Sequence, residues 1–195
     1  MADIALFHSV LGVRPGVRDA AERLCGAAHA VTIVDQYDGR VFDDYDTAAA
    51  HAEAIGYPIL MQRALDGVAK LPDGFVAVGF SNGGGMAEYV AIHRRVAGVV
   101  LLSGALPLEM LGVEAWAAGV PVQIHYTLDD PFRRQEWIDA LVAKIEAAGA
   151  PVEVFDYPGS GHLITDPSLP SEHDADAAAL LWNRVIGFCS TASAE

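Results

Sequence analysis

The stretch GFVAVGFSNGGG at residues 74–85 decides the fold. An apolar run leads into the pentapeptide G-F-S-N-G centred on Ser81, and two more glycines follow. In a G-x-S-x-G pattern the serine sits on a sharp turn between a buried strand and a helix, and side chains at the glycine positions would collide with neighbouring backbone. The stretch therefore predicts a strand, a tight turn and a helix. Such a turn exposes the Ser81 hydroxyl at a helix amino end, which favours developing negative charge.

Apolar runs alternate with helical patterns along the rest of the chain. Most of these runs are continuously apolar, as strands buried on both faces require. The expected strands lie near 4–9, 30–35, 75–80, 98–103, 120–126 and 151–157. Helical spacing of apolar residues recurs between them, including two helices within 47–71. The alternation predicts an α/β fold with a mostly parallel central sheet and helices on both faces. Ligands bind such sheets beyond the carboxyl ends of the strands.

Length and composition fit one compact domain spanning residues 1–195. Hydrophobic residues make up 52% of the chain and charged residues 19%, which suits a buried sheet. A net charge of −14 disfavours nucleic acid and anionic membranes as partners. The N-terminus carries Asp3 where a signal peptide needs positive charge, and no apolar run is long enough for a membrane span. We therefore expect a cytoplasmic protein.

Nucleotide and metal binding find little support in the sequence. No GxxxxGK[ST] pattern occurs, and the segment after the first strand lacks GxGxxG spacing. The two cysteines are far apart without CxxC spacing, and the group Asp43, Asp44 and Asp46 lacks the spacing of a calcium loop. A solvated acidic loop is the expected role of that group. The sequence predicts neither a metal nor a cofactor.

A serine nucleophile needs a base, and in hydrolases with this turn the order is serine, acid, histidine. Four histidines follow Ser81 in the chain: His93, His125, His162 and His173. His162 has the expected position, in the glycine-containing loop after the last strand. The other three fit a helix surface, a buried strand and the start of the final helix.

Three aspartates are candidates for the acid that orients the base. Asp129 and Asp130 follow the fifth expected strand at its carboxyl end. Asp156 lies within the last strand, where we expect its side chain to point into the packing of the sheet. The position favours the first two and leaves the choice between them open.

Five motifs make the chain similar to the dienelactone hydrolase family of α/β-hydrolases. FHSVLGVRPGVRDAAERL resembles the family's first strand, glycine loop and helix, and VDQYDG resembles its P-D-L-Y-x-G. GFSNGGG resembles its nucleophile turn, and HYTLDDPF resembles H-x-G-x-x-D-x-F. YPGSGH resembles Y-x-x-A-G-H, which carries the base. The motifs occur in the family's order over nearly the whole chain.

The resemblance implies an α/β-hydrolase fold without a lid domain and a triad of Ser81, Asp130 and His162. The family's acid lies five residues beyond the histidine of its motif, which selects Asp130. The implied oxyanion donors are the backbone N–H groups of Asn82 and Val10.

The chain departs from the family at two positions that bear on the substrate. Ser81 stands where many members have cysteine, and Ser9 stands where those members carry a glutamate that interacts with the resting nucleophile. The resemblance thus implies a serine esterase for small esters or lactones, with Ser9 at the substrate-binding site, rather than a true dienelactone hydrolase.

Two other functions fit the same residues. The first is thioester hydrolysis or acyl transfer by the same triad, and the second is non-catalytic binding of a small molecule on a hydrolase fold. In each case the expected partner is a small molecule, and the expected assembly is a monomer or a weak homodimer.

Overall fold

The computed structural model describes residues 1–192 as one central sheet covered by helices. The strands are β1 (Asp3–Phe7), β2 (Ala30–Val34), β3 (Phe75–Phe80), β4 (Val96–Leu102), β5 (Val122–Thr127) and β6 (Val152–Tyr157). The helices are α1 (Pro15–Gly26), α2 (Tyr45–Ile55), α3 (Tyr57–Gly67), α4 (Asn82–His93), α5 (Gln135–Ala147) and α6 (Ala175–Ala192). A short 3-10 helix, η1, covers Leu108–Leu111.

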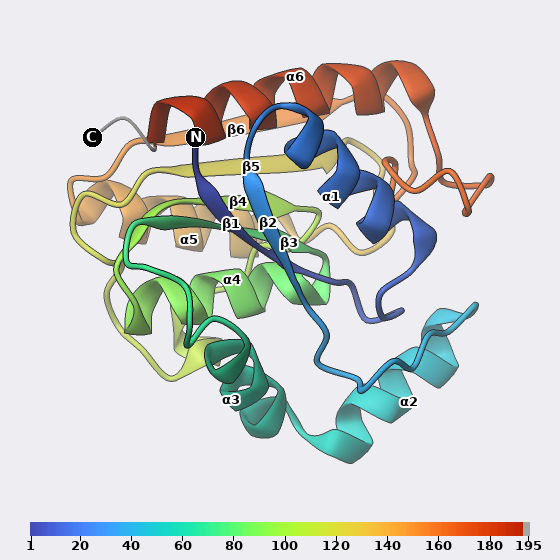
Figure 1. The fold of residues 1–195 in the computed structure, drawn as a ribbon, viewed down its shortest axis with the longest axis horizontal. Coiled ribbons are helices and arrows are strands. Elements are labelled where there is room, and N and C mark those ends of the chain that lie inside the picture. Colours follow the sequence, from blue (N-terminus) through green and yellow to red (C-terminus); the bar gives the residue numbers. More distant parts are fainter. Residues whose placement is uncertain (193–195) are drawn as a thin grey trace.

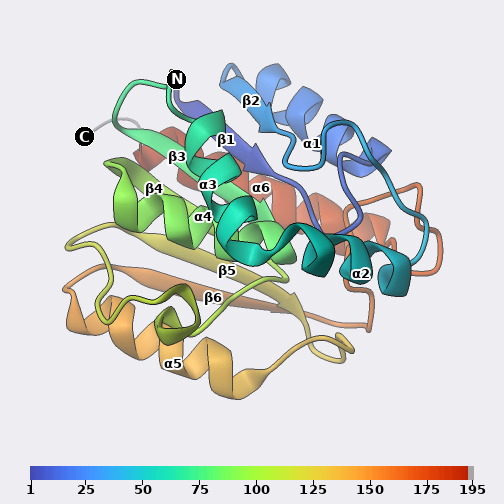
Figure 2. The same cartoon turned by 90° about the horizontal axis from the view of Figure 1, so that it is seen from below.

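The six strands run in the order β2-β1-β3-β4-β5-β6, and every neighbouring pair is parallel. Helices α1 and α6 cover one face, whereas α3, α4 and α5 cover the other (Figures 1 and 2). Successive β1 side chains point to opposite faces of the sheet. Ile4 packs in the core under α1 and α6, and Phe7 packs in the core on the other face. Burial on both faces explains why the central strands β3 and β4 are continuously apolar. The α/β fold and the two helix layers are confirmed.

All six predicted strands are confirmed, and each strand begins and ends within two residues of its predicted position. Helix α2 begins at Tyr45, two residues earlier than expected, because the Asp44 carboxylate accepts a hydrogen bond from the Thr47 N–H (2.7 Å) and caps it. The expected solvated acidic loop is thus part of a helix start, and Asp43 pairs with Arg14. No helix within residues 1–192 is long and apolar enough to cross a membrane.

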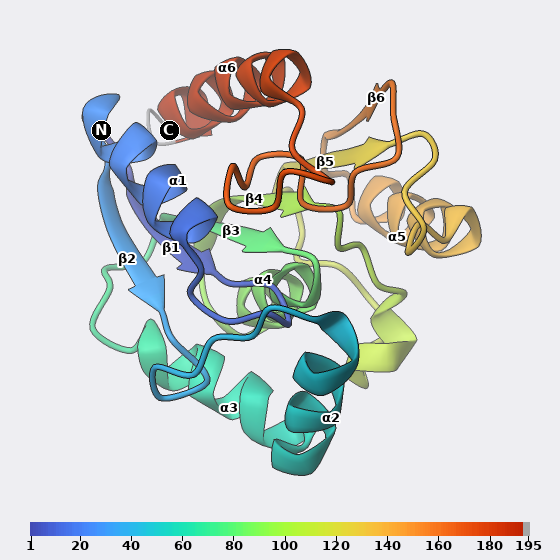
Figure 3. The same cartoon turned by 90° about the vertical axis from the view of Figure 1, so that its right-hand side faces the viewer.

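The carboxyl ends of the strands converge at one edge of the sheet, onto which Figure 3 looks. Helix α2 lies beside this edge, as does the segment between β6 and α6. The loops that carry the candidate residues after β1, β3, β5 and β6 therefore meet in one place. This is the position expected for the site of a parallel α/β sheet.

Glu88 is a fully buried carboxyl on α4, directly behind this edge. Its Oε1 accepts a hydrogen bond from the Leu106 N–H (2.9 Å), and its Oε2 has no hydrogen-bond partner among residues 1–192. Burial raises the pKa of Glu88 well above its ordinary value, and the Leu106 N–H opposes this more weakly. The folded protein thus retains a proton that the unfolded chain releases.

Glu88→Gln should stabilise the protein at alkaline pH and flatten the dependence of its stability on pH. Native Glu88 binds its proton more tightly than unfolded Glu88, so the free energy of unfolding falls as pH rises through the interval between the two pKa values. Glutamine keeps an acceptor for Leu106 and has no proton to lose. Thermal unfolding from about pH 4.5 to pH 8 should show a Tm advantage that grows with pH, with ~1 kcal/mol giving about 2–4 °C. A difference that is constant across this range would contradict the expectation.

Candidate active site

The turn after β3 holds Ser81 in a strained conformation at the amino end of α4. Its φ is +50° and its ψ is −116°, a backbone geometry that non-glycine residues rarely adopt. A Cβ on Gly79 would collide with the Gly83 carbonyl, and a Cβ on Gly83 would lie 2.5 Å from the carbonyl oxygens of Phe7 and His8. The glycines are therefore required by close backbone approach, as the sequence pattern indicates.

His162 and Asp130 complete a continuous chain of hydrogen-bonding groups with this serine. Ser81 Oγ lies 2.7 Å from His162 Nε2, and His162 Nδ1 lies 2.7 Å from Asp130 Oδ2. Asp130 Oδ1 also accepts a hydrogen bond from the Phe132 N–H (2.8 Å), which fixes the orientation of the carboxylate. His162 and Asp130 are 4% and 6% exposed, so the pair is shielded from water. The structure brings together three residues that are far apart in sequence.

The other two candidate acids lie outside this arrangement. Asp129 is exposed, and the contact to His162 is made by Asp130 instead. The expectation that Asp156 points into the packing of the sheet is wrong. Its carboxylate is 44% exposed and pairs with Arg133 at 2.7 Å, because β6 is an edge strand that is only partly covered.

The remaining histidines have structural surroundings. His125 is buried in β5 beside Tyr157, with His125 Nδ1 2.8 Å from the Tyr157 hydroxyl. Burial, with a smaller effect from Arg184, lowers the pKa of His125 to about 3, so its ring is neutral. His93 is the last residue of α4, and His173 Nδ1 contacts the Ile164 carbonyl at 2.8 Å. His173 precedes α6 rather than starting it.

The two expected oxyanion donors have free backbone groups. Asn82 is the first residue of α4, and Val10 lies in the loop after β1. Among the hydrogen bonds within residues 1–192, none is donated by the backbone N–H of either residue. The amino end of α4 adds the positive end of its dipole beside Ser81. These N–H groups can therefore donate hydrogen bonds to a negatively charged oxygen.

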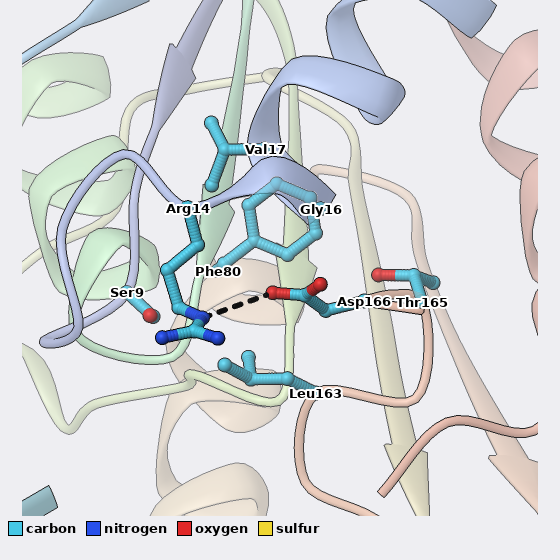
Figure 4. A pocket seen from close by; sticks show the side chains of 8 residues that line it. All are labelled: Ser9, Arg14, Gly16, Val17, Phe80, Leu163, Thr165 and Asp166. Atoms are coloured by element: carbon cyan, nitrogen blue, oxygen red, sulfur yellow. Dashed lines mark ion pairs between the residues drawn. The ribbon is translucent and has the colours of Figure 1, made fainter. Parts of the chain in front are cut away.

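Ser9 precedes Val10 in the same loop and is 2% exposed. Its hydroxyl accepts a hydrogen bond from the Leu11 N–H (3.2 Å), and its contact with a substrate stays a prediction. Beyond it lies a cavity of about 10 Å³, which matches a single water molecule (Figure 4). The cavity is lined by Ser9, Arg14, Gly16, Val17, Phe80, Leu163, Thr165 and Asp166.

Arg14 is a buried residue that sequence reasoning missed. Its Nε lies 3.5 Å from Asp166, as the dashed line in Figure 4 marks, and its Nη1 donates to the Phe42 carbonyl (2.6 Å). The guanidinium thus ties the loop after β1, which carries the Val10 N–H, to the segment that follows His162. Nothing in the sequence identifies this role of Arg14, which becomes visible only from the contacts of the folded chain.

Two aromatic rings lie beside the His162 imidazole. The Phe132 ring centroid lies 4.7 Å from that of His162, and the Tyr45 ring lies 6.0 Å from it. Tyr45 donates its hydroxyl proton to the Glu172 carboxylate (2.9 Å), and burial followed by that carboxylate raises the pKa of Tyr45 far above its ordinary value. Phe132 is 47% exposed, so part of its ring is available to a ligand. Tyr45 was missed because it was expected in a loop.

Within residues 1–192, no group of three or more His, Cys, Asp or Glu side chains is placed to hold a metal ion.

Comparison with known proteins agrees with the motifs over the length of the chain. A model described as the dienelactone hydrolase family matches residues 2–193. No curated protein matches the chain.

Solved structures share the fold at low sequence identity. A protein named m3DLH is 20% identical, with a TM-score of 0.80 and coverage of 98% of this chain and 86% of its own. A dienelactone hydrolase-like promiscuous phosphotriesterase from metagenomic libraries is 22% identical, with a TM-score of 0.81 and the same coverage. A Bacillus cereus carboxylesterase is 16% identical, with a TM-score of 0.56 and coverage of 98% and 89%. These likenesses show an α/β-hydrolase fold, and residues 1–192 contain no separate lid domain.

Proposed function

Because the chain belongs to the dienelactone hydrolase family and is a carboxylic ester hydrolase, we propose that it cleaves small esters or lactones through Ser81, His162 and Asp130. The observation that carries this proposal is the unbroken contact from Asp130 through His162 to Ser81, with both distances at 2.7 Å. Ser81 is also held at positive φ at the amino end of a helix. In this kind of turn the hydroxyl faces outward from the sheet, where a substrate can reach it.

Each group has one role in the proposed reaction. The His162 Nδ1–H donates a hydrogen bond to the Asp130 carboxylate and keeps its proton, so in this tautomer Nε2 is unprotonated and can accept the proton of the Ser81 hydroxyl. Ser81 Oγ attacks the substrate carbonyl as its proton passes to Nε2. Asp130 stabilises the resulting imidazolium. His162 then returns the proton to the leaving oxygen, and an acyl-serine ester remains.

The negative charge of the tetrahedral intermediate falls on the carbonyl oxygen. The free N–H groups of Asn82 and Val10 and the amino end of α4 are the donors for that oxygen. One such donor typically contributes ~3 kcal/mol to the transition state. Water then attacks the carbonyl of the acyl-serine and gives a proton to His162 Nε2. His162 passes this proton to Ser81 Oγ as the acid is released.

The rings of Phe132 and Tyr45 form one wall of the proposed substrate site. They lie 5.1 Å apart and both face the imidazole, so a substrate bound to Ser81 meets an aromatic surface. An aromatic surface favours apolar acyl or leaving groups. The strong negative charge of the protein adds no attraction for anionic esters.

Turnover and covalent labelling together test the proposed function. The protein should hydrolyse one or more members of a panel of nitrophenyl esters, lactones and thioesters, and the panel also separates ester from thioester specificity. A fluorophosphonate should form a single adduct that mass spectrometry assigns to the peptide containing Ser81. Folded protein that shows neither turnover nor an adduct on Ser81 would overturn the proposal and favour a non-catalytic binding role.

A further inference from the structure

The segment Gly161–Leu163, which carries the proposed base, lies outside the helices and strands. A base must hold its geometry closely, since a displacement of about 1 Å can reduce a rate by about 100-fold. An irregular segment has no ladder of backbone hydrogen bonds to provide that rigidity. The structure supplies it through side chains from elsewhere in the chain.

Three consecutive residues of this segment each have one backbone group bonded to a side chain. Thr127 donates its hydroxyl proton to the Gly161 carbonyl (2.8 Å). Ser103 donates its hydroxyl proton to the carbonyl of His162 itself (2.8 Å). The Leu163 N–H donates to Glu172 Oε2 (2.7 Å). The backbone is thus held on both sides of the imidazole as well as at the residue that bears it.

The elements that provide these side chains are themselves fixed by the sheet. Thr127 is the last residue of β5 and is 1% exposed, and Ser103 directly follows β4. Ser103 has a φ of +57°, and its own N–H donates to the His125 carbonyl of β5 (2.8 Å). A serine in this left-handed region is strained, a feature that clusters at functional sites. In this conformation the Ser103 hydroxyl reaches the carbonyl of His162.

Glu172 connects the segment to the aromatic wall. The carboxylate that accepts from Leu163 also accepts the Tyr45 hydroxyl proton, at 2.9 Å to Oε1 and 3.0 Å to Oε2. Tyr45 packs against the His162 ring. One side chain therefore restrains the backbone of the base segment and a ring beside the imidazole.

We propose that Ser103, Thr127 and Glu172 are positioning residues that act through His162, an inference that rests on the proposed function. None of their side chains bonds to Ser81 or Asp130; the Asp130 N–H donates only to the Thr127 backbone carbonyl (3.5 Å), a bond that a side-chain substitution keeps. They hold the backbone from which the imidazole projects, so that its two nitrogens meet the serine and the carboxylate at the same time. Removal of the Ser103 or Thr127 hydroxyl should lower kcat with little change in KM, because neither side chain bonds to the aromatic wall. Removal of the Glu172 carboxylate should also raise KM, because it holds Tyr45.

Matched substitutions isolate the hydroxyl groups. Thr127→Val keeps the shape of the side chain and removes the donor, whereas Thr127→Ser keeps the donor. Ser103→Gly removes the hydroxyl and relieves the backbone strain, so a loss of activity cannot come from added strain. For the carboxylate, Glu172→Gln keeps an acceptor and Glu172→Ala removes it.

The expected result is a fall in kcat of about 10- to 100-fold for Thr127→Val and Ser103→Gly, with near wild-type activity for Thr127→Ser. Glu172→Ala should lose more activity than Glu172→Gln. In a His162→Ala background, Thr127→Val should leave the residual rate unchanged, because residues that act through one another are not additive. The same fold-loss in that background would overturn the proposal, as would unchanged kcat in the folded Val and Gly variants.

A spectroscopic measurement keeps the test independent of turnover. The His162 Nδ1 proton, hydrogen-bonded to Asp130, should give a low-field proton resonance in wild-type protein. Thr127→Val should broaden or shift it, and Thr127→Ser should retain it. An identical resonance in both variants would contradict positioning even if the protein hydrolyses esters. Absence of turnover in wild-type protein with a resonance that responds to Thr127→Val would instead refute the proposed function alone.

Discussion

Ser81→Ala should abolish ester hydrolysis and leave the fold intact. Removal of Oγ eliminates the only atom of the proposed site that can form the acyl ester, while His162 and Asp130 remain in contact. In serine hydrolases the loss of the nucleophile reduces kcat by about a million-fold. Alanine keeps a Cβ at the strained φ of +50°, so the turn carries the same backbone strain as with serine. The measurements are kcat on a nitrophenyl ester, labelling by a fluorophosphonate and thermal unfolding.

Ser160→Ala is the matched control for this substitution. Ser160 is exposed and lies in the same loop as His162. It should retain wild-type turnover and labelling, since exposed substitutions away from packed features change stability by about 0.5 kcal/mol or less. Turnover in Ser81→Ala that matches wild type would refute the assignment of the nucleophile. Loss in both variants would point to disturbance of the loop instead.

The sequence predicts the frame of this fold because its strongest signals are local. Strands buried on both faces leave continuous apolar runs, and the runs before Ser81 and before Asp130 mark β3 and β5. The turn between β3 and α4 is equally readable, because only glycine fits where Gly79 and Gly83 meet neighbouring backbone. Order within the sheet is set by long-range pairing and carries no local signature.

The candidate site is only partly readable for the same reason. His162 and Ser81 follow from motif and position, but the choice of Asp130 over Asp129 needed the resemblance to a family. Asp156 was set aside for a wrong reason, since a sequence does not reveal that β6 lies at an edge of the sheet.

The supporting residues leave no pattern in the sequence at all. Ser103, Thr127 and Glu172 act through contacts made to the base segment across sequence separations of 59, 34 and 9 residues. Their side chains are common surface types, and a positive φ at a serine such as Ser103 has no compositional signal. Such contacts become visible only once the order of the strands places their loops together.

Asp130→Asn should reduce kcat far more than Asp129→Asn. The Asp130 carboxylate accepts a hydrogen bond from the His162 Nδ1–H, with 2.7 Å between Oδ2 and Nδ1. The asparagine amide can instead donate an N–H to Nδ1. That exchange favours the wrong tautomer, in which Nε2 carries the proton and cannot accept one from Ser81. In a serine protease the equivalent change lowers kcat by about 10,000-fold. We expect a loss of about 1,000-fold or more here, measured on the same nitrophenyl ester.

Asp129→Asn is the internal control, because it makes the same chemical change at the adjacent residue. Asp129 is exposed, and its backbone N–H donates to the Gly159 carbonyl (3.0 Å), a bond that the substitution keeps. Its turnover should stay near that of wild type. Equal losses in the two variants would show that the acidic loop acts through its overall charge. A larger loss in Asp129→Asn would move the acid to that residue and require a different orientation of His162.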